Sequence, residues 1–124
     1  MTIADELEKF GNFHDWYIDI IATSKEGGGS TPNTLTLALY DQTRRATVTF
    51  CGVTRAAIEG GGLLNIVNAI EVLEQDNEAY AVAISMLERS AHFGRHHGDH
   101  IAYVFSTVGA EIAVEFDSLR IETA

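Results

Sequence analysis

Apolar and polar side chains alternate along several short stretches of this chain, and each alternation predicts a β-strand. Leu35, Leu37 and Leu39 are separated by threonine and alanine. Because successive side chains of a strand point to opposite faces, this spacing predicts a strand whose leucines are buried. The stretch 45–53 repeats the pattern with Phe50 on the buried face. The short connection between the two stretches predicts a β-hairpin.

Two further stretches within the first 74 residues are apolar enough to be strands. In residues 16–23, Trp16, Ile18 and Ile20 share the face that we expect to be buried. Residues 63–74 fit a helix as well as a strand, because their apolar positions match both spacings. Their β-branched side chains favour the strand.

A second hairpin is predicted near the C-terminus. Residues 101–106 and 111–116 alternate around a Val-Gly turn. On the returning strand we expect the apolar side chains to face the core and Glu115 to face the solvent. A last short extended piece covers Leu119 and Ile121.

Helical spacing occurs in two places. Thr2 and Asp5 form a variant of the capping box in front of a short helix within residues 1–12. Residues 78–89 are rich in alanine, glutamate, leucine and methionine, with apolar positions on one face. They predict the principal helix of the fold.

Together these elements predict an α+β fold over residues 1–124, which we expect to form a single domain. The sheet is expected to be a mainly antiparallel curved sheet or small sandwich of about five or six strands, with one principal helix on a face. A histidine-rich loop at 90–100 follows that helix. The glycine runs 27–29 and 60–62 lack the residues of a phosphate-binding loop, so we interpret them as connectors.

The charge balance narrows the choice of partners. The chain of 124 residues has 18 acidic and 8 basic residues and a formal net charge of −10. Because phosphate binding needs a basic patch, this composition argues against nucleic acid. A protein partner, or a second copy pairing through an uncovered edge strand, is compatible with it.

Composition also bears on location. No apolar run reaches the roughly 20 residues that a membrane helix requires, so we expect no membrane partner. The acidic N-terminal residues lack the layout of a secretory signal. The single cysteine, Cys51, excludes an intrachain disulfide. We therefore expect a cytoplasmic protein.

The densest group of chemically active side chains lies in the loop at 90–100. Its candidate metal ligands are His92, His96, His97, Asp99 and His100. His96 and His97 diverge if the chain is extended, and Gly94 weakens a helical pairing of His92 with His96. His97, Asp99 and His100 could instead wrap an ion within the loop. The sequence leaves these sets open for a divalent transition metal.

His14 and Asp15 are a second candidate site, because a carboxylate can orient an imidazole for general-base chemistry. Neighbouring side chains of a strand point to opposite faces, however, which argues against a catalytic dyad. We therefore expect this pair to mark the start of a strand, with Asp15 capping exposed amides.

The run Phe13-His14-Asp15-Trp16 resembles the first strand of small uncharacterised bacterial domains. Two later pieces, 48–53 and 108–112, add to a resemblance that covers about residues 13 to 122. Some similar domains are immunity or accessory proteins of bacterial toxin systems. The resemblance implies no catalytic residue, and the histidines at 96–100 are outside its pattern.

Two functions follow as hypotheses. The first is a non-enzymatic, immunity-like interaction module that binds a protein through an acidic surface. The second is a metal- or small-molecule-binding protein, with the loop at 90–100 as its site and enzymatic activity left open.

Overall fold

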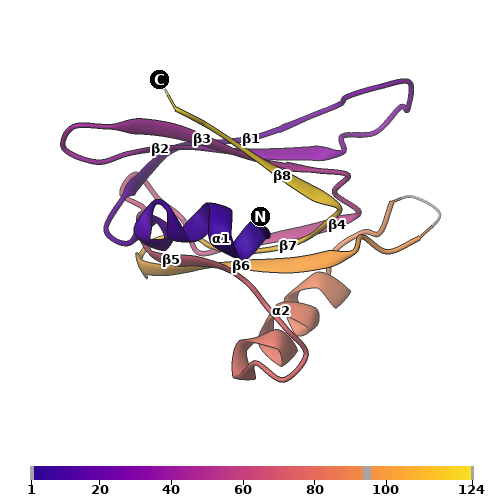
Figure 1. Ribbon diagram of the computed structural model, residues 1–124. Coiled ribbons are helices and arrows are strands. Elements are labelled where there is room, and N and C mark those ends of the chain that lie inside the picture. The colour runs from indigo at the N-terminus through magenta and orange to yellow at the C-terminus, as the bar shows by residue number, and fades with distance from the viewer. Residues whose placement is uncertain (1, 94–95, 124) are drawn as a thin grey trace.

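The computed structural model describes residues 2–93 and 96–123, and it is built mainly from β-strands (Figure 1). Eight strands occur in this described part, and all of them belong to one antiparallel sheet. The sheet has the order β4-β7-β6-β5-β1-β2-β3-β8. The strands are β1 Tyr17–Ser24, β2 Thr34–Tyr40, β3 Arg45–Cys51, β4 Arg55–Glu59, β5 Ile66–Val72, β6 His100–Val108, β7 Glu111–Phe116 and β8 Ser118–Thr123. The helical elements are α1 Ile3–Glu8, the 3-10 turn η1 Gly11–Phe13 and α2 Glu78–Glu88.

The sheet folds over on itself at one corner. There β3 continues into β4 and β7 continues into β8, so that two consecutive pairs of strands bend together. The pairing of Cys51 with Ser118 is followed, after the bend, by that of Arg55 with Glu115. Figure 1 shows the result as two layers, with β1, β2, β3 and β8 above and the other strands below.

The bend depends on a glycine. Gly52 has φ +65°, a backbone conformation that side-chain-bearing residues rarely adopt. A Cβ atom at this position would lie 2.6 Å from a carboxylate oxygen of Asp117, which sits between β7 and β8. The amide of Asp117 donates to the carbonyl of Cys51 at 3.0 Å and fastens the corner.

The main core fills the space between the two layers. Leu37, Val48 and Phe50 enter it from the upper layer, and Ile70 and Phe116 from the lower layer. Helix α1 and the turn η1 lie at the open side between the layers, where Leu7 and Phe13 join the same core (Figure 1).

A second core lies beneath the lower layer, where α2 covers its outer face (Figure 1). Met86 and Leu87 of the helix pack against Tyr103 of β6 and Ala113 of β7. Both faces of β7 are therefore buried, and Ile112 through Phe116 are all shielded from solvent. Among the described residues, no helix combines the length and apolar character needed to cross a bilayer.

Several sequence predictions are confirmed. Thr2 and Asp5 form the expected capping box at the start of α1. β2 and β3 form the predicted hairpin, with the three leucines of β2 buried. The ambiguous stretch at 63–74 contains β5, and α2 occupies the predicted principal helix.

The predicted number of five or six strands is wrong, since the described residues form eight strands in one sheet. The stretch that becomes β4, Arg55–Glu59, contains two alanines and no alternation of large apolar side chains. The final extended piece is a full strand, β8, that pairs along β3. β4 is not predicted from the sequence because its pairing with β7 is set by the fold and not by its own residue pattern.

Two predicted orientations are also wrong. A register shift between Ile18 and Ile20 turns Ile20 outward, and it is 54% exposed. Such a bulge reverses the alternation for the rest of the strand, and Ile21 faces the core instead. Glu115 was expected to face solvent, but it is only 3% exposed because the chain after α2 covers that face of β7.

Gly109 lies in the turn of the hairpin formed by β6 and β7, where the packing is tight. It has φ +89°, and a Cβ atom would lie 2.6 Å from the carbonyl oxygen of Leu64. We expect Gly109→Ala to lower the free energy of unfolding by about 2 kcal/mol, measured by urea denaturation. Gly28→Ala is the control, because its added methyl meets no atom within 4 Å and its φ is not positive. Equal effects of the two substitutions would contradict the structure.

Candidate functional site

A buried carboxylate, Glu115 of β7, is the centre of the candidate site. Arg55, at the start of β4, donates to it from two nitrogens: Nη2 lies 2.7 Å from Oε2, and Nε lies 3.2 Å from Oε1. The hydroxyl of Thr54 donates to Oε1 at 2.5 Å. The Arg55 side chain is itself only 13% exposed. An ion pair with this burial needs all of its hydrogen bonds, and here each carboxylate oxygen has at least one donor.

The chain between α2 and β6 is tied onto this centre. The amide of Gly98 donates to the hydroxyl oxygen of Thr54 at 3.0 Å, and the amide of Phe93 donates to the Thr54 carbonyl at 3.0 Å. A Cβ atom on Gly98 would lie 2.7 Å from the backbone nitrogen of Phe116, so only glycine allows this close approach to β7. The amide of Asp99 donates to Asp117 at 3.1 Å.

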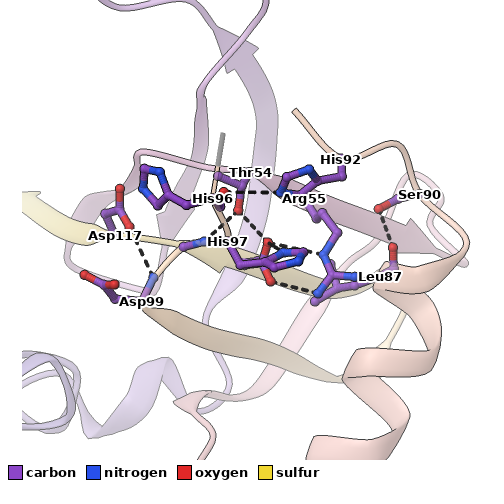
Figure 2. Close-up of polar contacts among 11 residues, drawn as sticks. Thr54, Arg55, Leu87, Ser90, His92, His96, His97, Asp99 and Asp117 are labelled. Atoms are coloured by element: carbon purple, nitrogen blue, oxygen red, sulfur yellow. Dashed lines mark hydrogen bonds and ion pairs between the residues drawn. The ribbon is translucent and has the colours of Figure 1, made fainter. Parts of the chain in front are cut away.

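Two histidines of this segment, His92 and His97, lie close to Glu115. Figure 2 shows the His97 side chain beside that of Arg55. Nδ1 of His97 lies 3.0 Å from Oε1 of Glu115 and donates to it. The rings of His92 and His97 have centroids 4.4 Å apart. Each of the three residues offers one ligand atom, and these atoms all lie within 4.8 Å of one another. We call this set the His92–His97–Glu115 cluster.

The hydrogen bonds keep Glu115 ionised. Burial opposes this by raising the pKa of the carboxyl group, but the hydrogen bonds from Arg55, Thr54 and His97 outweigh burial and lower the pKa from 4.5 to about 2. The carboxylate is therefore a negatively charged acceptor at any physiological pH.

The structure separates the other predicted ligands from the cluster. His96 lies on the side of Asp117 in Figure 2, and its backbone carbonyl accepts from Nε2 of His92 at 3.2 Å. Asp99 is exposed, and the ring of His100 packs against Phe116 with centroids 5.6 Å apart. Gly94, which the sequence analysis placed between His92 and His96, lies outside the described residues.

The second predicted pair, His14 and Asp15, does come together. Nε2 of His14 lies 3.4 Å from Oδ2 of Asp15 although the residues are adjacent. They precede β1 instead of lying in it, and Asp15 has φ +64°, which turns its side chain toward that of His14. Because neither residue lies in a strand, their side chains need not point to opposite faces. Among the described residues, the Asp15 carboxylate accepts no hydrogen bond from a backbone amide, so the expected capping role is absent there.

Sequence reasoning missed Thr54, Arg55 and Glu115. Arg55 and Glu115 are 60 residues apart, and their contact exists only because β4 pairs with β7. One signal was available: Glu115 interrupts an otherwise apolar strand, Ile-Ala-Val-Glu-Phe. A charged residue inside such a strand is buried when a partner charge is at hand.

Comparison with known proteins finds no family model that matches the chain and no curated protein that matches its sequence. The resemblance to small bacterial domains therefore stays a prediction.

The lowered pKa of Glu115 predicts how stability depends on acid. The carboxylate stabilises the fold fully above pH 4.5, and this stabilisation is lost as the pH falls toward 2, because the unfolded chain then binds the proton first. The loss amounts to about 3 kcal/mol. We expect Glu115→Gln, measured by urea denaturation across this range, to be destabilised at neutral pH and to lose less stability on acidification. The exposed Glu74→Gln is the control and should follow the wild-type profile. A wild-type slope in Glu115→Gln would contradict the assignment.

Proposed function

We propose that this protein binds a divalent transition metal ion at the His92–His97–Glu115 cluster. The observation that carries the proposal is the convergence of two imidazoles and one carboxylate, with ligand atoms within 4.8 Å of one another. Imidazole nitrogen and carboxylate oxygen are both ligands of zinc and related ions. The carboxylate belongs to the sheet and the histidines belong to the segment before β6, so an ion would join two parts of the fold.

The separations suit coordination after a small adjustment. Ligands at 2.0–2.2 Å from a tetrahedral ion are about 3.3–3.6 Å apart. The Nδ1 of His97 and Oε1 of Glu115 are already 3.0 Å apart, held by a shared proton that a metal ion would replace. His97 is 64% exposed and His92 is exposed as well, so both rings can rotate to close the remaining distance.

Residues around the cluster orient its ligands. Nε2 of His92 faces the carbonyl oxygen of His96, so this nitrogen carries the proton and Nδ1 is left as the metal-binding atom. A backbone carbonyl is a common partner for the second nitrogen of a metal-binding histidine. Thr54 and Arg55 fix the plane of the Glu115 carboxylate. Because Arg55 also neutralises part of its charge, we expect micromolar and not nanomolar affinity.

Three protein ligands leave one position of a tetrahedral ion free for water or an external group. The cluster lies at the surface on the histidine side, and this position would face solvent. We therefore propose metal binding only. The fourth ligand would be water or a group from another molecule.

A thermal-shift series with Zn²⁺, Ni²⁺ and Mn²⁺ tests the proposal. At free metal tenfold above the Kd, binding to the native state adds about 1.4 kcal/mol and raises the Tm by roughly 5 °C. We expect His92→Ala/His97→Ala to abolish the shift. His96→Ala/His100→Ala removes the same number of histidines from the same segment and should retain it.

The control separates this cluster from nonspecific binding by a histidine-rich segment. A shift that is absent from the wild type, or equal in the two double variants, would overturn the proposal. Because the Tm of each variant without metal is measured in the same experiment, a loss of folding is not mistaken for a loss of binding.

The acidic composition favours a second candidate, a cytoplasmic interaction module for a basic protein. An open cleft of about 570 Å³ beside the start of β6 is lined by the exposed carboxylates of Glu74, Asp76 and Asp99. Such a surface would speed association with a positively charged partner and lose its effect in salt. Glu74→Lys/Asp76→Lys should then lose any salt-sensitive partner captured by the wild type, whereas Glu8→Lys/Glu122→Lys should keep it. Capture that does not respond to salt would count against this candidate.

A further inference from the structure

A second open cleft, of about 730 Å³, lies at the other end of the sheet from the His92–His97–Glu115 cluster. It is formed by η1, the residues leading into β1, and the turn between β2 and β3. Figure 1 shows η1 and this turn on the left, whereas β6 starts on the right. The two sites share no lining residue, so the cleft can be argued independently of the metal proposal.

The backbone beside the cleft is strained. Asn12, Phe13 and Asp15 have φ of 55°, 61° and 64°. This left-handed conformation is uncommon outside glycine and is an outlier for a bulky residue such as phenylalanine. It is maintained by anchors on β5: the Asn12 side chain donates to the Ile70 carbonyl at 3.0 Å, and the Asp15 amide donates to the Val67 carbonyl at 2.8 Å. Backbone strain of this kind concentrates at ligand sites.

The strained segment brings two hydrogen-bond acceptors together at the edge of the cleft. Nδ1 of His14 lies 2.9 Å from the carbonyl oxygen of Asn68 and must donate to it, since a carbonyl only accepts. In the neutral ring, Nε2 then carries a lone pair, and it lies 3.4 Å from Oδ2 of Asp15. With both atoms acting as acceptors, a donor placed beside them can bridge the two. Both side chains are well exposed, at 60% and 73%.

The other charges of the cleft cancel. Arg44 donates from Nε and Nη2 to Oδ2 of Asp41, at 3.1 and 2.7 Å, and its guanidinium lies 4.8 Å from the centre of the Trp16 ring. The negative charge of Asp15 therefore has no other cation among the residues lining the cleft, apart from a protonated His14.

The same cleft also has an aromatic wall. Tyr17 and Tyr40 line the cleft with ring centroids 5.2 Å apart, and Tyr17 is 38% exposed. Aromatic faces attract both apolar rings and cations. The cleft thus combines a carboxylate, a second acceptor and an apolar surface, and its volume is that of a small-molecule site.

From this combination we propose that the cleft binds a small organic amine, in its ammonium form, that carries an aromatic ring. The ammonium group donates one hydrogen bond to Nε2 of His14 and one to Oδ2 of Asp15. The ring packs against Tyr17 and Tyr40. The charge of Asp15 selects the amine over a neutral or acidic molecule of the same shape.

The single tryptophan of the chain gives a fluorescence signal from the wall of this cleft. Trp16 lines the cleft, and the metal cluster contains no fluorophore of this kind. We would titrate the protein with phenethylamine at about pH 8, where free imidazole is neutral and the amine is charged, and follow Trp16 emission. We expect a saturable change with phenethylamine and none with 2-phenylethanol, which has the same ring and a neutral end.

Two variants complete the test. Asp15→Asn should weaken phenethylamine binding at least tenfold, a loss of about 1.4 kcal/mol, and asparagine tolerates the left-handed backbone at this position. Glu88→Gln removes the same charge from an exposed position outside the cleft and should bind as the wild type does. Amide shifts in NMR spectra should map to residues 14–17 and 40–44.

The proposal is overturned by any of three results. These are an unchanged Trp16 emission with phenethylamine, an equal response to 2-phenylethanol, or wild-type affinity in Asp15→Asn. The far-ultraviolet circular dichroism of each variant checks its folding.

Discussion

The buried ion pair of Glu115 with Arg55 is the interaction on which the arrangement of this protein depends. It joins β7 to β4 just beyond the corner where the sheet folds over. Through the hydroxyl of Thr54 it also holds the chain that leads from α2 into β6. A charged pair shielded from water is stabilising only when every polar atom has a partner. That requirement fixes β7, β4 and the chain between α2 and β6 relative to one another. If one of them moved, a buried charge would lose its partner.

The same ion pair, together with Thr54, determines which histidines of the segment come together. A loop with four histidines has many ways to present them, and the sequence alone favours none. Once Gly98 is pressed against Phe116 and its amide is bound by Thr54, the neighbouring residue, His97, has to lie over the carboxylate. The buried carboxylate of Glu115 is held rigidly, whereas the exposed rings of His92 and His97 can adjust their positions.

Local pattern predicted the parts of the fold whose own side chains determine their structure. The leucines of β2, the capping box of α1 and the helix α2 were all found this way. The pattern failed where a neighbouring strand determines the conformation of a segment or the direction of a side chain. β4 is a strand because β7 lies beside it, and Ile20 points outward because a bulge shifts the register of β1. Likewise, the histidines His92 and His97 were visible in the sequence, but their third partner was not, since Glu115 is close to them only in the folded chain.

The pairing of β1 with β5 has a consequence for how the two layers are joined. At the corner, the layers are continuous through two pairs of bent strands, but on the opposite side they meet at a single register pair, Tyr17 with Ile66. Three backbone hydrogen bonds flank that pair: Ile18 donates to Asn65, Val67 donates to Trp16, and Asp15 donates to Val67. The two layers are therefore joined firmly at the corner and only narrowly at the junction between β1 and β5. On heating, the layers should separate first at the β1–β5 junction, which lies beside the strained segment before β1. The corner, with its buried ion pair, should stay closed.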